Sequence, residues 1–185
     1  MPKIVNGWWL VVGGGFTLIE LLVLLSIIAG LALFGFANYR SLKESQNLKN
    51  SSSDIQSLIR QAEFNAASRL NCSGGAGPNW FIYLTDATHL DLRCQVTGGP
   101  VVIVKTVVLS NNILINSIAG TCQATFPVKI SFAPLTGAVT FADPNDTPAC
   151  LSGAAVTNVT ITVVNNNTSE TKIFKLSQGG ALDVQ

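Results

Sequence analysis

The longest apolar stretch of the chain runs from Phe16 to Ala37, and its only side chains with a charge or a hydroxyl are Thr17, Glu20 and Ser26. A helix over these residues spans about 33 Å, close to the roughly 30 Å of a bilayer's hydrocarbon layer. An ordinary secretory signal has a shorter apolar region, of roughly 7 to 15 residues. The pattern therefore predicts a transmembrane helix over residues 16–38.

Residues 39–71 are polar but keep apolar side chains at steps of three and four positions. This spacing places them on one helical face, so we expect an amphipathic helix that packs on a folded head. The segment from Asn50 to Asp54 is rich in capping residues, and Asp54 is a candidate N-cap. Either the helix bends or restarts there, or it runs unbroken from Phe16 to Leu70 over about 82 Å. The apolar positions are Ile55, Leu58, Ile59, Ala62, Ala66 and Leu70.

Beyond the turn-rich segment from Asn71 to Pro78, the composition shifts to Val, Ile, Thr and Phe. Such runs, bounded by turn residues, predict strands. The short links Leu135–Gly137 and Asn165–Asn167 favour antiparallel hairpins over helical crossovers. The predicted strands are Trp80–Leu84, Leu90–Val96, Val101–Leu109, Val128–Phe132, Ala138–Phe141, Val156–Val164 and Lys172–Leu176.

These elements predict an α+β protein. Its long N-terminal α-helix has a transmembrane half and an amphipathic half, and packs on an antiparallel β-sheet head over residues 72–185. Alternation of apolar and polar residues, as in Val128–Phe132, is typical of a sheet that is covered on one face. We expect the amphipathic helix to be that cover.

Charge gives little indication of a partner, because 11 Lys and Arg balance 10 acidic residues. Without a basic field, nucleic acid is not expected to bind. The chain has one histidine, His89, and no nucleophile elbow or phosphate-binding loop. We therefore expect no enzyme, no catalytic residue and no cofactor. Asp86, His89 and Asp91 lie close together in sequence as a candidate metal site, but we favour a solvated loop.

The chain has four cysteines, and all of them follow the apolar segment. None forms a C-x-x-C pair, which disfavours a zinc site. Two disulfides formed in an oxidising compartment fit this even number, and four buried free thiols are the alternative. Three pairings are possible, and we favour the sequential one because it closes two short loops. It joins Cys72 to Cys94 and Cys122 to Cys150.

The residues from Gly15 to Val23 read G-F-T-L-I-E-L-L-V, and this motif resembles the signature of type IV prepilins. The resemblance implies that residues 1–15 are a leader peptide. A prepilin peptidase would cut between Gly15 and Phe16 and methylate the new amine of Phe16. Glu20 would then be the fifth residue of the mature chain.

The resemblance also implies a role for Glu20 in assembly. Its carboxylate would pair with the Phe16 amine of a neighbouring subunit, which offsets the cost of burying an unpaired charge. The alternative is that Glu20 reaches the nearby membrane interface and contributes nothing to assembly. Many pilins have a proline near the middle of this helix, and here Gly30 and Gly35 are the candidates to replace it. They would either let the helix stretch locally or let helices pack closely.

The function implied is a structural subunit of a type IV pilus or pilus-like filament. Its partners would be copies of itself, the prepilin peptidase, the pilus assembly machinery of the inner membrane, and membrane lipid before assembly. The chain would be a single-pass membrane protein with an extracytoplasmic head, and later part of an extracellular filament at the cell surface.

Two other functions stay open: a minor pseudopilin of a type II secretion or DNA-uptake system, and a membrane-anchored adhesion or binding module. The head more loosely resembles H-type pseudopilins. Phe132-Ala133-Pro134-Leu135 runs on to Thr136-Gly137, which is similar to their F-x-P-x-G hairpin. This resemblance favours a head with two sheets.

Overall fold

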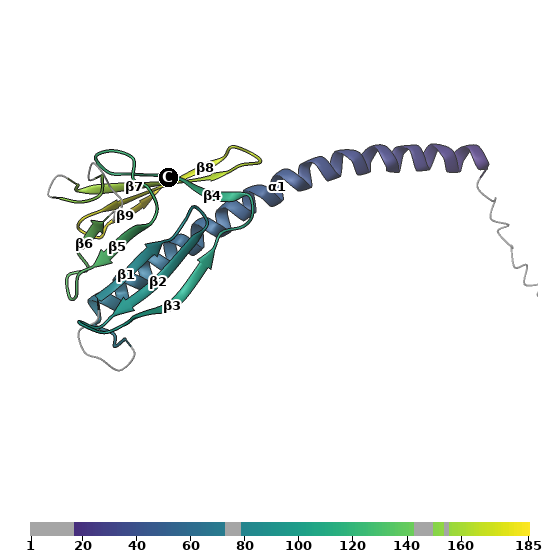
Figure 1. Ribbon diagram of the computed structural model, residues 1–185. Coiled ribbons are helices and arrows are strands. Elements are labelled where there is room, and N and C mark those ends of the chain that lie inside the picture. Colours follow the sequence, from purple (N-terminus) through teal and green to yellow (C-terminus); the bar gives the residue numbers. More distant parts are fainter. Residues whose placement is uncertain (1–16, 73–78, 143–149, 154–155) are drawn as a thin grey trace, which may run out of the picture. The chain divides into compact units, whose positions relative to one another are not determined.

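Residues 17–72, 79–142, 150–153 and 156–185 are described by a computed structural model (Figure 1). The side chains of residues 33–38 lie outside this description. The chain divides into two compact units, Met1–Arg40 and Ser41–Gln185. One helix, α1 (Leu18–Ala67), crosses the boundary between them.

In the first unit, α1 starts directly after Thr17. The backbone N–H of Glu20 donates to the Thr17 hydroxyl at 3.3 Å, and that of Leu21 donates to the Thr17 carbonyl at 3.1 Å. Thr17 is therefore the N-cap, because its side chain accepts from a backbone donor of the first turn, which also donates to the Thr17 carbonyl at 3.1 Å. No described side chain from residue 17 to residue 32 is buried.

In the second unit, the predicted amphipathic face of α1 is buried. Ile55, Leu58 and Ala62 are 0% exposed, and Ile59 and Ala66 are nearly so. The helix runs without a break through Asn50–Asp54, so a restart at Asp54 is wrong. Leu70 was also wrongly placed on this face, because it lies beyond the end of α1 and is 44% exposed.

The strands form two antiparallel sheets (Figure 1). The five-stranded sheet has the order β3-β2-β1-β5-β6, and the four-stranded sheet has the order β4-β7-β8-β9. The strands are β1 (Asn79–Leu84), β2 (His89–Gln95), β3 (Val101–Val108), β4 (Ile113–Ala119), β5 (Val128–Phe132), β6 (Val139–Ala142), β7 (Asn158–Asn165), β8 (Thr171–Ser177) and β9 (Leu182–Val184).

All seven predicted strands are present, with ends shifted by at most two residues. Both predicted hairpins are confirmed, because β5 pairs with β6 and β7 with β8 in antiparallel register. Strands β4 and β9 were missed. A register shift between Ile115 and Ser117 interrupts the alternation in β4, and β9 has only three residues.

One hydrophobic core joins α1 to both sheets. Ile55 and Leu58 of α1 belong to the same buried cluster as Ile82 of β1 and Phe174 of β8. Burying one side chain of this size contributes roughly 1.5 to 3 kcal/mol to the stability of the fold. The core therefore holds the helical segment after Ser41 firmly in the second unit.

The fold class that we expected is wrong. The described residues of the second unit are mostly β-sheet and form nine strands in two sheets. Helix α1 contributes only its residues after Arg40 to that unit. The earlier part of the helix belongs to a separate unit and buries no described side chain. A long N-terminal helix packed along a sheet is therefore not the architecture.

The expected localisation is contradicted as well. Among the residues that the structure describes, no helix combines the length and the apolar composition needed to cross a membrane. We therefore do not retain the single-pass membrane topology with an extracytoplasmic head, nor the surface location derived from it.

Candidate assembly site

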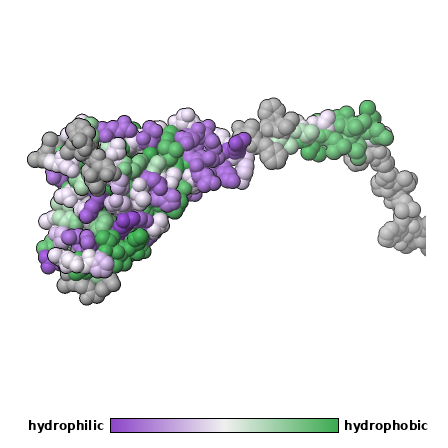
Figure 2. Space-filling model, in the orientation of Figure 1, coloured by the Kyte–Doolittle hydropathy of each residue, from purple (hydrophilic) through white to green (hydrophobic). Residues whose placement is uncertain are grey.

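The most exposed apolar surface of the described residues is the first part of α1. We call residues 18–32 the apolar helix segment; it is green in Figure 2. Leu18 is 79% exposed, Ile19 69% and Leu31 68%. Apolar area left in water is unfavourable by about 25 cal/mol per Å², so such a surface favours association. The other large exposed side chains of the segment are Leu21, Leu22, Val23, Leu24, Leu25, Ile27 and Ile28.

One side of the apolar helix segment carries a shallow open groove. It is lined by Ile19, Glu20, Val23, Leu24 and Ile27. These residues follow the i, i+4 rows that form ridges and grooves on a helix surface. A second helix could therefore pack here, with Glu20 at the edge of the contact.

Glu20 lies in the first turn of α1, three residues after the N-cap Thr17. This is the spacing of a capping box, and an acid near a helix N-terminus is also favoured by the helix dipole. Our sequence interpretation missed this local role, although the pattern T-x-x-E is visible in the motif. Glu20 therefore has a structural reason to be acidic in addition to the assembly role implied by the resemblance.

The other processing and assembly residues, Gly15 and Phe16, lie outside the described residues. The expected cleavage between them, the methylation of Phe16 and its pairing with Glu20 therefore stay predictions. Of these three residues, the structure places Glu20 alone, as one of the residues that line the apolar groove.

Comparisons with known proteins give no relative. No family model, no curated protein and no solved structure matches the chain. The resemblance to type IV prepilins therefore depends on the residues from Gly15 to Val23 alone.

A polar cluster ties α1 to the four-stranded sheet. The carboxylate of Glu44 accepts hydrogen bonds from the side-chain amides of Asn112, Asn165 and Asn167, at 3.3, 3.2 and 3.1 Å. Glu44 is only 9% exposed, and Asn165 is 0% exposed. Sequence reasoning missed this cluster, because the three asparagines lie 68 to 123 residues from Glu44 in the chain.

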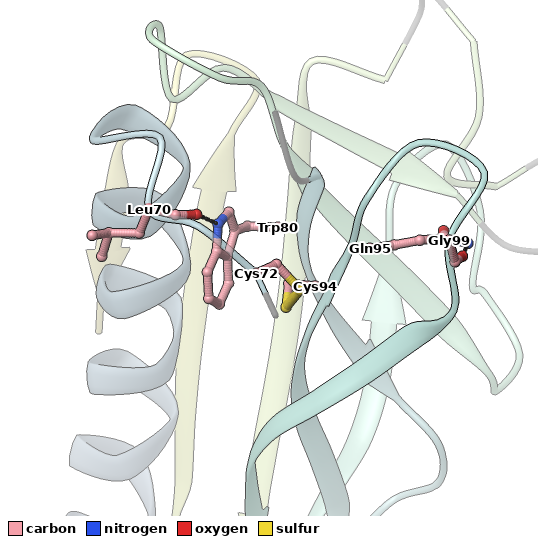
Figure 3. Close-up of a disulfide and its surroundings, with 6 residues drawn as sticks. All are labelled: Leu70, Cys72, Trp80, Cys94, Gln95 and Gly99. Atoms are coloured by element: carbon pink, nitrogen blue, oxygen red, sulfur yellow. Dashed lines mark hydrogen bonds between the residues drawn. A yellow bond between two sulfur atoms is a disulfide. The ribbon is translucent and has the colours of Figure 1, made fainter. Parts of the chain in front are cut away.

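The Cys72–Cys94 disulfide ties the segment that follows α1 to β2 (Figure 3). Beside it, the indole N–H of Trp80 donates to the Leu70 carbonyl at 3.0 Å. Both contacts fix the chain where it leaves the helix. This is half of the sequential pairing that we favoured.

The Cys122–Cys150 disulfide joins the segment after β4 to the one before β7. The two segments approach closely at Gly120, where an added Cβ would collide with the Cys150 carbonyl oxygen. The Thr121 backbone N–H donates to that same oxygen at 3.0 Å. The sequential pairing is thus complete, and among the described residues no cysteine is free.

Asp86 and His89 lie in a hydrogen-bonded turn. Asp86 Oδ1 accepts from the backbone N–H of Thr88 at 2.7 Å and from that of His89 at 2.9 Å. Hydrogen bonds from the Thr88 backbone, together with those from His89, lower the pKa of Asp86 from 3.8 to about 2. Within the described ranges, no three His, Cys, Asp or Glu side chains gather as metal ligands would.

Asp91 is engaged on the face of the five-stranded sheet. It pairs with Arg93 and accepts a hydrogen bond from the Thr106 hydroxyl at 2.7 Å. Burial raises the pKa of Asp91, but the hydrogen bonds from Arg93 and Thr106 outweigh it, so the pKa is lowered overall. Arg93 also lies 4.2 Å from the centre of the Tyr83 ring. The network stabilises the surface of this sheet.

Proposed function

We propose that this chain is a structural subunit of a pilus-like filament, and that it polymerises through its apolar helix segment after cleavage between Gly15 and Phe16. The observation that carries the proposal is the exposure of the ten large apolar side chains between Leu18 and Leu31. Residues 18–23 of the prepilin-like motif belong to that same surface.

Burial between copies supplies the driving force. A fully buried Leu or Ile contributes roughly 1.5 to 3 kcal/mol relative to an exposed one. Apolar side chains surround the segment on all sides, so each helix can contact more than one neighbour. A repeated head-to-tail contact of this kind produces an open filament rather than a closed oligomer.

Glu20 sets the register of these contacts in the proposal. It is the only ionisable side chain between Leu18 and Leu31. A carboxylate enclosed by apolar helices needs a counter-charge, and cleavage before Phe16 would create one in the new amine. The prepilin peptidase and a filament assembly machinery are the partners that this route requires.

A minor pseudopilin in a secretion or DNA-uptake system is the second candidate. The two-sheet head favours it, because that is the head implied by the loose resemblance around Phe132–Gly137. Abundance separates the two candidates, since a major subunit dominates the mass of a filament and a minor one does not.

A charge in the groove tests the proposal. Replacing Val23 or Ile27 by Asp should abolish filaments and leave the thermal unfolding of the head unchanged, because neither side chain belongs to the buried core. Leu135→Asp is the matched control: Leu135 is 63% exposed but lies in the head, and this variant should assemble normally. Normal filaments from both groove variants would refute the proposal.

A further inference from the structure

Glu44 is the first buried side chain of α1 after the boundary at Ser41. A carboxylate this enclosed is costly unless hydrogen bonds satisfy its oxygens. The amides of Asn112 and Asn167 reach Oε1, and that of Asn165 reaches Oε2. The Asn165 amide also donates to the Glu44 carbonyl oxygen at 3.0 Å. The Asn165 amide thus binds both the side chain and the backbone of Glu44.

The orientation of the Asn165 amide is fixed by the turn after β7. Its Oδ1 accepts the backbone N–H of Asn167 at 2.9 Å and that of Thr168 at 3.4 Å. The amide nitrogen must therefore point toward Glu44. The backbone N–H of Asn166 donates to the Asn112 carbonyl at 2.9 Å, which joins the turn before β4 to the turn after β7.

We propose that Glu44 is a positioning residue for assembly, which locks the first head-bound turn of α1 to these two turns of the four-stranded sheet. The inference rests on the proposed function, because the lock matters only if the helix must leave the head from a fixed point. Without it, the turns of α1 before Leu48, the next buried apolar residue, lose their polar anchor to the sheet.

A carboxylate suits this position because it only accepts hydrogen bonds, whereas the three asparagine amides donate. Glu44→Gln keeps one acceptor, which can face the fixed Asn165 amide. The amides of Asn112 and Asn167 can turn over to accept from the new NH₂ group. Glu44→Gln should therefore retain most of the lock, and Glu44→Ala should lose it.

The test uses the full chain and two readouts, which are filament yield and amide hydrogen exchange of residues 41–48. In Glu44→Ala we expect amide exchange to be about tenfold faster, because a hydrogen bond to a charged group is lost. We expect the yield of filaments to fall by about the same factor. Glu44→Gln should stay near wild type. Lys43→Ala, an exposed neighbour on the same turn, should behave as wild type.

A core variant separates positioning from general destabilisation. Val128→Ala opens a cavity in β5 and lowers stability, but it leaves the Glu44 cluster intact. It should still form filaments. Equal loss of filaments in Val128→Ala and Glu44→Ala would overturn the positioning role, and so would wild-type exchange in Glu44→Ala. If the wild type itself forms no filaments, the proposed function fails while the exchange data still decide whether the lock exists.

Discussion

At the scale of single residues, Glu20 has two possible reasons to be acidic, and they make different demands on the side chain. As part of a capping box it needs only an acceptor, which Gln also supplies. As the counter-charge of an amine it needs the negative charge itself. The hydrogen bond from the Glu20 backbone N–H to the Thr17 hydroxyl is made by the cap residue and does not involve the Glu20 carboxylate.

Substitutions at these two positions separate the roles. Thr17→Ala removes the cap and should destabilise the helix start by about 1 kcal/mol, with filament yield little changed. Glu20→Gln keeps the capping geometry and should reduce filament yield strongly. Electron microscopy and circular dichroism of both variants check this. Full assembly by Glu20→Gln would mean that the carboxylate serves the cap alone.

The lowered pKa of Asp86 makes the stability of the fold depend on pH, and the sign of that dependence follows from the direction of the shift. Its pKa falls from 3.8 to about 2 in the folded chain, chiefly through the hydrogen bond from the Thr88 backbone. The charged form is therefore stabilised by folding. That contribution is complete above about pH 4 and is lost as the pH falls toward 2. It is small because the Asp86 side chain is 53% exposed.

We expect Asp86→Asn to unfold at a slightly lower temperature than wild type at pH 5, with the difference shrinking as the pH falls toward 2. Thermal melts at pH 2, 3, 4 and 5 measure this. A difference that grows as the pH falls would have the wrong sign for this explanation.

At the scale of elements, α1 and the strands were partly predictable. The spacing of Ile55, Leu58 and Ala62 marks a helical face, because a straight helix buries every third or fourth residue. Strand β4 was not predictable from alternation, because its bulge near Ile115 changes the side on which the next residues lie. The Glu44 cluster was not predictable either, since hydrogen bonds between distant loops leave no local pattern.

Gly30 tests how α1 meets its neighbours. It lies within a regular stretch of helix, and an added Cβ would meet no atom within 4 Å. The single chain therefore does not require glycine here. If helices of different copies approach at this point, Gly30→Leu should reduce filament yield far more than Gly30→Ala, which should strengthen the helix by about 1 kcal/mol. Equal loss in both would favour local stretching instead.

At the scale of the whole molecule, the expectation of one long helix packed on a sheet was wrong. The composition of the chain does not show at which residue a helix leaves the hydrophobic core. The spacing of apolar residues predicted the buried face of α1 from Ile55 onward, but not the boundary between the two units at Ser41.

The exposed edge of the five-stranded sheet is a second feature of the whole molecule. Strand β3 ends the five-stranded sheet and exposes Val101, Ile103, Val104 and Val108.

An exposed apolar edge strand promotes edge-to-edge association, and charged residues prevent it. Ile103→Lys should therefore reduce the aggregation of the full chain on concentration, with stability changed by less than about 0.5 kcal/mol. Thr140→Lys, on the opposite edge strand β6, is the control and should have no such effect. Light scattering and thermal melts decide; equal aggregation of wild type and Ile103→Lys would exclude the β3 edge as its cause.

The most direct test of the filament account is mass spectrometry of fibres purified from the native cells. The account predicts that the fibres contain this chain, that it begins at a methylated Phe16, and that it is the main component if it is a major subunit. A chain found only uncut between Gly15 and Phe16, or never found in fibres, would contradict it.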